Sequence, residues 1–326
     1  MPITTLLLVG ACVGDDPSVT VIGDAGGGEA GAVDAAPGVD AVAVEDAAPP
    51  PDAAPPRCDP KKAFGAPVLV SGLSTSADES TARLTADELT VYFARGAAGT
   101  GLPDLYMATR PSSQAGWGAA VPVPGVNTGG PDFAPMLTDD GLTLFFTSDS
   151  AGTRGGTDIF TSTRTKVSDT FPAGMTLAPL GVVNTAASEA DPYVVPSGKA
   201  IWFDAYVGPG DSDIYRSASG PTGLTTREKV LGIGSAAVDA YPVVTPDELT
   251  LYFASNRVDP DSLGDYEIYV ATRAVATAAF DQPKLLKVLS TADAEFPTWI
   301  SRDECELYLT RRVSGNYDIY RAERPQ

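Results

Sequence analysis

The sequence predicts an all-β protein, and three observations lead to this prediction. From residue 64 onward the chain repeats one pattern of short strands five times. An aromatic residue in the second strand of each copy recurs at intervals of 50 to 57 residues, and no stretch shows a helical period. Regular recurrence over five copies is typical of a repeat architecture. The five aromatic residues are Tyr92, Phe145, Trp202, Tyr252 and Tyr308.

The copy at residues 239–273 shows the pattern most clearly. It contains an apolar strand at 241–245, a Thr-Pro-Asp-Glu turn, an alternating strand at 249–254, a polar loop and a third strand at 268–271. Pro, Asp and Gly are the residues that tight turns favour. The second strands carry apolar residues on both faces, which we expect when each sheet is packed between two others.

A fourth strand is expected between consecutive copies, and the candidates are the connectors at 121–123, 177–180, 229–231 and 285–288. The last copy ends near Arg321 without a connector, whereas residues 66–70 resemble one and precede the first copy. A ring in which the N-terminal strand completes the last sheet leaves no long unpaired edge. We therefore predict a five-bladed β-propeller of four-stranded blades, with residue 68 beside the strand at 318–322.

A sequence motif supports this fold. Pro135 to Phe146 with residues 158–160, and Pro242 to Phe253 with residues 267–269, follow the pattern P-x-x-(S/T)-x-D-(G/E)-x-x-L-Y-F, then a polar loop, then D-I-Y. This pattern resembles the PD40 or WD40-like repeat of TolB-type propellers, over about residues 64–322. The resemblance implies a propeller, used in that family as a periplasmic or surface binding module or as an accessory domain of peptidases. The G-x-S-x-G motif of such peptidases does not occur in this sequence.

The N-terminal residues predict export and lipid anchoring. Residues 1–12 resemble a lipoprotein-type signal peptide: an apolar run, too short to span a bilayer, ends in Val-Gly-Ala-Cys, which makes Cys12 the expected lipidation site. No Lys or Arg precedes the run, so a chance apolar N-terminus is the alternative. Residues 13–63 are rich in Ala, Gly, Asp and Pro and predict a disordered acidic tether, followed by the propeller at 64–326. We expect a lipid-anchored protein of the cell envelope, on the periplasmic or surface face of the outer membrane.

The two other cysteines form an even pair. If Cys12 carries lipid, Cys58 and Cys305 remain, one just before the first strand and one in the last repeat. In an oxidising compartment they are candidates for a disulfide. Spacing alone does not fix connectivity, so two unpaired thiols remain the alternative.

Charge and composition exclude several functions. The chain has 42 Asp and Glu against 22 Lys and Arg; nine of the acids and one of the bases lie in residues 1–57, which leaves 33 against 21 in residues 58–326. Such a surface repels phosphate backbones, so we expect no nucleic-acid partner. Histidine is absent, which removes the commonest general base, the usual zinc ligand and the standard partner of a nucleophilic Ser or Cys.

Two sets of repeated acids are candidate site residues. One set opens the third strands, and we expect these acids to fix the preceding loops: Asp104, Asp158, Asp213, Glu267 and Asp318. The other set lies at the start of the first, innermost strands: Glu79, Asp132, Glu189, Asp239 and Glu295. If these five carboxylates converge on one channel mouth, they need water, hydrogen bonds or a cation, and Ca²⁺ suits hard oxygen ligands. The alternative is that they cap the incoming turns.

The loop at residues 259–267 is a second, weaker candidate for calcium. Its alternating acids resemble a calcium loop, but Leu263 stands where a ligand is needed and Val270 where the bidentate Glu belongs. We interpret it as a solvated acidic loop.

The sequence leads to two functional hypotheses. The first is a non-enzymatic, monomeric cell-envelope lipoprotein whose propeller binds a protein or glycan partner through its rim loops. The alternative is a carbohydrate-active, glycosidase-like enzyme that uses carboxylates of the axial pocket, since such chemistry needs two or three carboxylates and no histidine. Recurrence of the acids at equivalent positions favours the first, because a glycosidase places its acid and its nucleophile in different environments.

Overall fold

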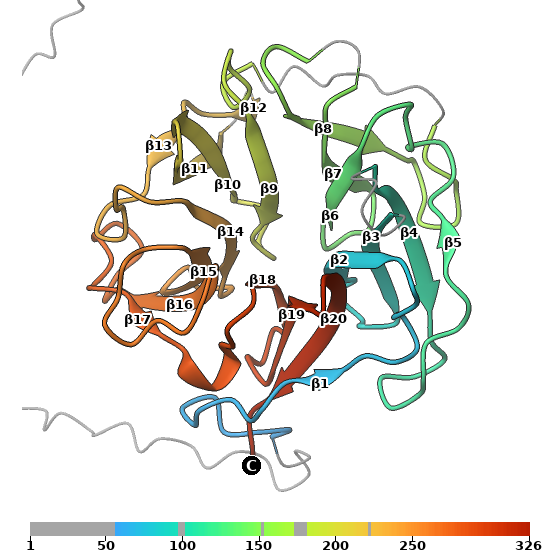
Figure 1. The fold of residues 1–326 in the computed structure, drawn as a ribbon. Helices are drawn as coiled ribbons and strands as arrows, with labels where there is room; N and C mark the ends of the chain where they lie inside the picture. The colour runs from blue at the N-terminus through green and yellow to red at the C-terminus, as the bar shows by residue number, and fades with distance from the viewer. Residues whose placement is uncertain (1–55, 97–101, 151–152, 173–180, 221–222) are drawn as a thin grey trace, which may run out of the picture. The chain divides into compact units, whose positions relative to one another are not determined.

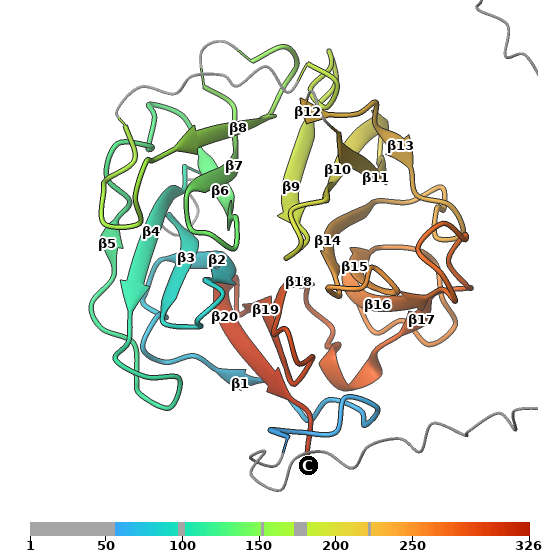
Figure 2. The ribbon, with the colours of Figure 1, turned by 180° about the vertical axis from the view of Figure 1, so that it is seen from behind.

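The computed structural model describes residues 56–96, 102–150, 153–172, 181–220 and 223–326. Its contacts divide the chain into Met1–Ala53 and Ala54–Gln326. The second unit forms a ring of five antiparallel sheets around a central axis (Figure 1), and the same ring is seen from behind in Figure 2. The predicted five-bladed propeller is confirmed. The predicted signal peptide, its Cys12 and most of the tether lie outside the described residues.

The blades follow one another along the chain. Blade 1 consists of β2 (Asp78–Leu84), β3 (Thr90–Gly96), β4 (Asp104–Thr109) and β5 (Val121–Pro122). Blade 2 consists of β6 (Asp132–Leu137), β7 (Thr143–Ser148) and β8 (Asp158–Thr163); its predicted fourth strand at 177–180 lies outside the described residues. Blade 3 consists of β9 (Glu189–Val194), β10 (Ala200–Gly208) and β11 (Asp211–Gly220), with β12 (Gly223–Leu224) and β13 (Glu228–Lys229) both paired to β11.

The last two blades complete the ring. Blade 4 consists of β14 (Asp239–Val244), β15 (Thr250–Ser255), β16 (Glu267–Thr272) and β17 (Lys284–Leu285). A single 3-10 turn, η1 (Lys287–Leu289), leads to blade 5, which consists of β18 (Glu295–Ile300), β19 (Glu306–Val313), β20 (Asn316–Glu323) and β1 (Val68–Leu69). Within the described residues no helix is long and apolar enough to cross a membrane.

The ring closes where the sequence predicts. β1 pairs antiparallel with β20, with Val68 opposite Arg321, and Figure 1 shows the two strands side by side. A disulfide joins Cys58 to Cys305, and Cys305 lies in the turn between β18 and β19. The predicted disulfide is therefore present, and the two cysteines are not free thiols. Arg57 adds ion pairs to Glu88 of blade 1, at 2.9 Å, and to blade 5. Strand pairing, a disulfide and ion pairs therefore hold residues 57–69 to the last blade.

The Thr-x-Asp part of the repeat motif forms the turns between first and second strands. In blade 1, Thr85 Oγ1 donates to Asp87 Oδ1 at 2.6 Å, and the same oxygen accepts the N–H of Leu89 at 3.0 Å. Blades 2, 4 and 5 repeat the arrangement. Each turn contains a residue with φ near +60 to +70°, as at Glu88 and Gly141. Glycine adopts a positive φ most readily, but most of these residues are not glycine, and the side-chain hydrogen bonds stabilise the turn instead.

The core lies between neighbouring blades. The second strands are buried on both faces, as expected for sheets packed on two sides, and their fully buried aromatic residues are Phe93, Phe146, Trp202, Phe203, Phe253 and Tyr308. Removing one such side chain from water contributes roughly 1.5–3 kcal/mol. The interfaces between blades therefore provide the main stabilisation.

Candidate functional site at the propeller axis

A bulge in each innermost strand directs backbone groups toward the axis. The register of β2 shifts between Ser80 and Arg83, and that of β6 and β14 shifts at the matching place. Thr81, Ala134, Asp191 and Tyr241 have φ of 51–55° there. Such a bulge leaves the N–H of the extra residue outside its own ladder.

These N–H groups bond to the neighbouring blade. The N–H of Thr81 donates to Thr310 Oγ1 of blade 5 at 2.9 Å, and Thr81 Oγ1 accepts the N–H of Ala134 of blade 2 at 3.2 Å. The N–H of Tyr241 donates to Asp204 Oδ1 of blade 3 at 3.2 Å. Hydrogen bonds between blades thus surround the axis and fix the side chains beside each bulge.

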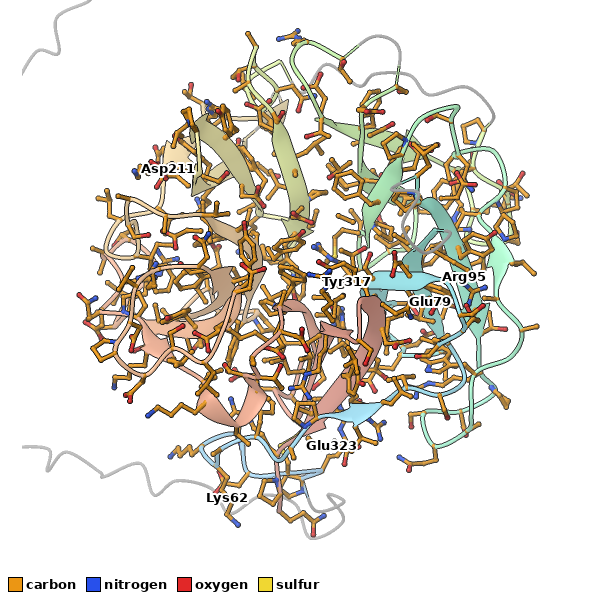
Figure 3. The ribbon with its side chains drawn as sticks, in the orientation of Figure 1. Lys62, Glu79, Arg95, Asp211, Tyr317 and Glu323 are labelled. Carbon is orange, nitrogen blue, oxygen red and sulfur yellow. A yellow bond between two sulfur atoms is a disulfide. The ribbon has the colours of Figure 1, made fainter. Side chains whose placement is uncertain are left out.

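The five acids at the start of the first strands cap turns. All five are fully buried, and each accepts hydrogen bonds from a Thr or Ser four residues earlier; Glu79 Oε2, for example, accepts the N–H of Thr75 at 2.9 Å. Arg95 pairs with Glu79 at 2.8 Å, as Figure 3 shows, and the other arginine pairs are Arg227 with Glu189, Arg257 with Asp239 and Arg311 with Glu295. Asp132 has no arginine partner among the described residues, and burial raises its pKa.

These contacts bear on the predicted cation site. Each of the five carboxylates finds its partners within its own blade, which is the capping geometry. The described residues contain no group of three or more His, Cys, Asp or Glu side chains arranged to hold a metal ion. The structure thus buries the five acids in separate blades rather than bringing them together at a channel mouth.

Two of the third-strand acids, Asp158 and Glu267, bond to the loops before them. Asp158 Oδ2 accepts the N–H of Arg154 at 2.5 Å, and Glu267 Oε1 accepts the N–H of Leu263 at 2.6 Å. Asp213 instead pairs with Lys229. The last two, Asp104 and Asp318, lie opposite Arg95 and Arg311 in the strand register.

The acidic loop at 259–267 shows no convergence of its carboxylates. Asp259 Oδ1 accepts the N–H of Asp261 at 2.8 Å, while Asp261 itself forms an exposed ion pair with Lys287 at 2.7 Å. Glu267 points back to the N–H of Leu263. The side chains that would bind calcium are engaged with different partners.

A buried charged cluster, formed by Arg83, Asp191 and Asp204, lies among the innermost strands. Arg83 is 2% exposed, donates to the carbonyl of Pro192 and lies 5.3 Å from the ring centroid of Tyr193. Burial lowers the pKa of Arg83 to about 10 and raises that of Asp204 to about 6. Burial and the neighbouring Asp204 raise the pKa of Asp191 well above its usual value. One proton shared between the two carboxyl groups relieves their repulsion.

A pocket of about 290 Å³ opens at the end of the axis where the first strands begin. Four of the five blades contribute to its wall, which includes Asp78, Thr81, Phe133, Tyr241, Phe296 and Tyr317. Phe296 lies at the centre of the aromatic part, with ring centroids 4.4 Å from Tyr241, 5.5 Å from Tyr266 and 6.0 Å from Tyr317. Figure 3 shows Tyr317 near the centre of the ring and Glu79 further out in blade 1.

One carboxylate faces this aromatic pocket. Asp78 Oδ1 accepts the N–H of Tyr317 at 2.9 Å, which ties the start of blade 1 to blade 5. Among the described residues that line the pocket, Asp78 is the only charged one. Sequence reasoning missed this pocket, although a signal was present: Phe133 and Phe296 directly follow the capping acids of their strands.

Comparisons with known proteins show the fold only. No protein-family model matches this chain, and no curated protein matches it. Among solved structures, a thermostable family-43 glycoside hydrolase is 15% identical, with a TM-score of 0.50 over 76% of this chain and 88% of that one. The catalytic domain of a Coprinopsis cinerea GH62 α-L-arabinofuranosidase is 9% identical, with a TM-score of 0.50 over 81% of this chain and 97% of that one. TolB from Acinetobacter baumannii is 15% identical with a TM-score of 0.42; the match covers 77% of this chain but only 56% of TolB.

Proposed function

We propose that this protein is a non-enzymatic binding module of the cell envelope, which recognises a protein or glycan partner at the rim where the axial pocket opens. The observation that carries the proposal is the composition of the pocket wall in the described residues: aromatic rings from several blades and a single carboxylate. Concave, largely apolar sites with few polar groups are typical of ligand binding.

The arrangement of carboxylates argues against glycoside hydrolysis. That chemistry needs two carboxyl groups on either side of the scissile bond, about 5–9.5 Å apart. Of the described pocket residues only Asp78 carries a carboxyl group. Asp191 and Asp204 are adjacent members of blade 3, are 3% and 7% exposed, and share their environment with Arg83. They therefore do not face a substrate from opposite sides, and the likeness to glycoside hydrolases concerns the fold alone.

The proposed location is the cell envelope, with Cys12 as lipid anchor and residues 13–53, which precede the second unit, as tether. The apolar run before Cys12 and the acidic composition after it support this proposal. The disulfide at the closure of the ring agrees with an exported protein, because such bonds persist in oxidising compartments. Metabolic labelling with an alkyne fatty acid tests the anchor: the full chain incorporates label in a bacterial host, and the Cys12→Ala variant does not.

The binding proposal is tested with the full chain on glycan arrays and in envelope extracts. We expect a retained ligand with the wild-type protein, and its loss with Tyr317→Ala, which removes a ring from the pocket wall. Val275→Ala is the matched control, because Val275 is 56% exposed and does not line the pocket. Turnover of an aryl glycoside by the wild type, abolished in Asp78→Asn, would replace the proposal with the enzymatic alternative.

A further inference from the structure

We infer that the axial pocket binds an organic ammonium group, carried either by a small ammonium compound or by a lysine side chain of a partner protein. The inference rests on the proposed binding function and adds the chemical class of the ligand. It depends on the charge of the pocket, on its aromatic rings and on the hydrogen bonds that its hydroxyl groups already make.

The charge of the pocket favours a cation. Asp78 uses one carboxylate oxygen to accept the N–H of Tyr317, and the other oxygen has no partner among the described residues. No Lys or Arg side chain belongs to the described part of the wall. A carboxylate beside low-dielectric walls attracts a positive group more strongly than it would in water. The acidic excess of residues 58–326, 33 acids against 21 bases, adds a long-range field of the same sign.

The rings favour a cation with an apolar surface. Four aromatic side chains belong to the described wall: Phe133, Tyr241, Phe296 and Tyr317. Phe296 packs against the two tyrosines of the wall and also against Tyr266, which is not a residue of that wall. The face of an aromatic ring carries negative charge density, and several rings around one space form the cages that bind ammonium groups. An ammonium compound with methyl or methylene groups would contact the ring faces and leave its charge near Asp78.

The hydroxyl groups of the pocket wall are less suited to a sugar than to an ammonium group. The hydroxyls of Thr81 and Thr310 lie at the wall of the pocket, but each already accepts a backbone N–H from a neighbouring blade. Each hydroxyl therefore keeps one O–H donor and one acceptor lone pair for a ligand. A sugar ring needs several donors and acceptors around it, whereas an ammonium group needs ring faces and one anion.

One nearby cation opposes the proposed ligand. The guanidinium of Arg312, an exposed residue of β19, lies 5.9 Å from the ring centroid of Tyr317 but does not line the pocket. It repels a bound cation and competes for the same ring. Replacing Arg312 by a neutral residue is therefore expected to strengthen binding of the cation. If Arg312 and Tyr317 only stabilised the fold, the replacement would not strengthen binding.

The experiment is calorimetric titration of the full chain with four probes: choline, its uncharged isostere 3,3-dimethyl-1-butanol, Nα-acetyl-lysine amide and N-acetylglucosamine. We expect choline or the lysine derivative to bind at least about tenfold more tightly than the alcohol and the sugar. Tighter binding of choline identifies a small compound as the source of the ammonium group, and tighter binding of the lysine derivative identifies a protein partner.

Three variants test the site itself. Asp78→Asn keeps the acceptor for the Tyr317 N–H and removes the charge, so cation affinity should fall about tenfold. Arg312→Gln should raise it severalfold. Asp293→Asn removes one exposed charge in the loop leading to β18, outside the pocket wall, and should leave affinity unchanged within about twofold.

The outcomes separate this inference from the proposed function. Equal affinities for choline and the alcohol, tighter binding of the sugar, or no binding of any probe would each overturn the ammonium inference. The binding function itself fails on different results: no ligand retained by the wild type on glycan arrays or from envelope extracts, or turnover of a glycoside that depends on Asp78.

Discussion

At the scale of single residues, the most unusual feature is the charged cluster of Arg83, Asp191 and Asp204 within the ring. Buried charges cost free energy unless they are paired and hydrogen-bonded. Here Arg83 lacks partners for two of its nitrogens among the described residues, and Asp191 for one oxygen. The cluster joins β2 of blade 1 to β9 and β10 of blade 3.

The cluster predicts an unusual dependence of stability on pH. Burial raises the folded-state pKa of Asp204 from 3.8 to about 6, so between these values the folded protein binds more protons than the unfolded chain. The stability that this group contributes is present below pH 4 and is lost as pH rises through 6. Asp204→Asn should flatten the curve, as measured by urea unfolding at pH 4, 5, 6 and 7. If Asp204→Asn shows the same change of unfolding free energy with pH as the wild type, the raised pKa of Asp204 is contradicted. Asp293→Asn, at an exposed position, is the control and should keep the wild-type pH dependence.

At the scale of elements, short polar motifs hold each blade in shape. The Thr-x-Asp turn connects the first and second strands, and the hydroxyl residue four positions before each capping acid fixes the start of the first strand. Both motifs satisfy backbone N–H groups that the strands leave unpaired. They recur in the sequence because every blade needs the same connections, and this explains why repeated acids have structural roles.

The cap of blade 3 gives a direct test. Thr185 donates both its N–H and its hydroxyl to Glu189, at 2.8 and 2.6 Å. Thr185→Val keeps the shape of the side chain but leaves a buried carboxylate oxygen with one donor fewer, so we expect a loss of about 1–3 kcal/mol in unfolding free energy. Thr185→Ser retains the hydroxyl and should lose less than half as much. Equal losses for the two variants would mean that packing of the methyl group matters rather than the hydrogen bond.

At the scale of the whole molecule, the ring depends on joining its two ends. β1 contributes only two paired residues, Val68 and Leu69, to blade 5. A pairing this short is a weak closure by itself. The disulfide of Cys58 and Cys305 joins positions separated by 247 residues, and the ion pairs of Arg57 connect blades 1 and 5 at the same place.

Loss of the disulfide should therefore destabilise the whole ring. Closure of so long a loop restricts the unfolded chain strongly, and we expect reduction to lower the unfolding free energy by about 2–5 kcal/mol. Urea unfolding with and without reductant measures the effect. The Cys58→Ser, Cys305→Ser double variant is the control and should match the reduced protein and not respond to reductant. Unchanged stability on reduction would show that β1 and the aromatic interfaces close the ring without the bond.

Much of the fold followed from the sequence alone. The period of Tyr92 and its four counterparts predicted the number of blades, and the unmatched strand at residues 66–70 predicted how the ring closes. These features are readable because each blade repeats local turns and strand patterns, whose physical causes act within a few residues of one another. The spacing of Cys58 and Cys305, by contrast, left both pairing states open.

The candidate site was decided by the tertiary structure. The pocket combines Asp78, Tyr241, Phe296 and Tyr317 from three blades, and their sequence positions alone do not show that they meet. The conspicuous repeated acids instead lie buried in their blades with donors four residues away. The sequence by itself determined the blades, because short-range hydrogen bonds and alternating burial specify them. Only the closed ring determined the pocket, because a site at the axis exists only where side chains distant in sequence are brought together.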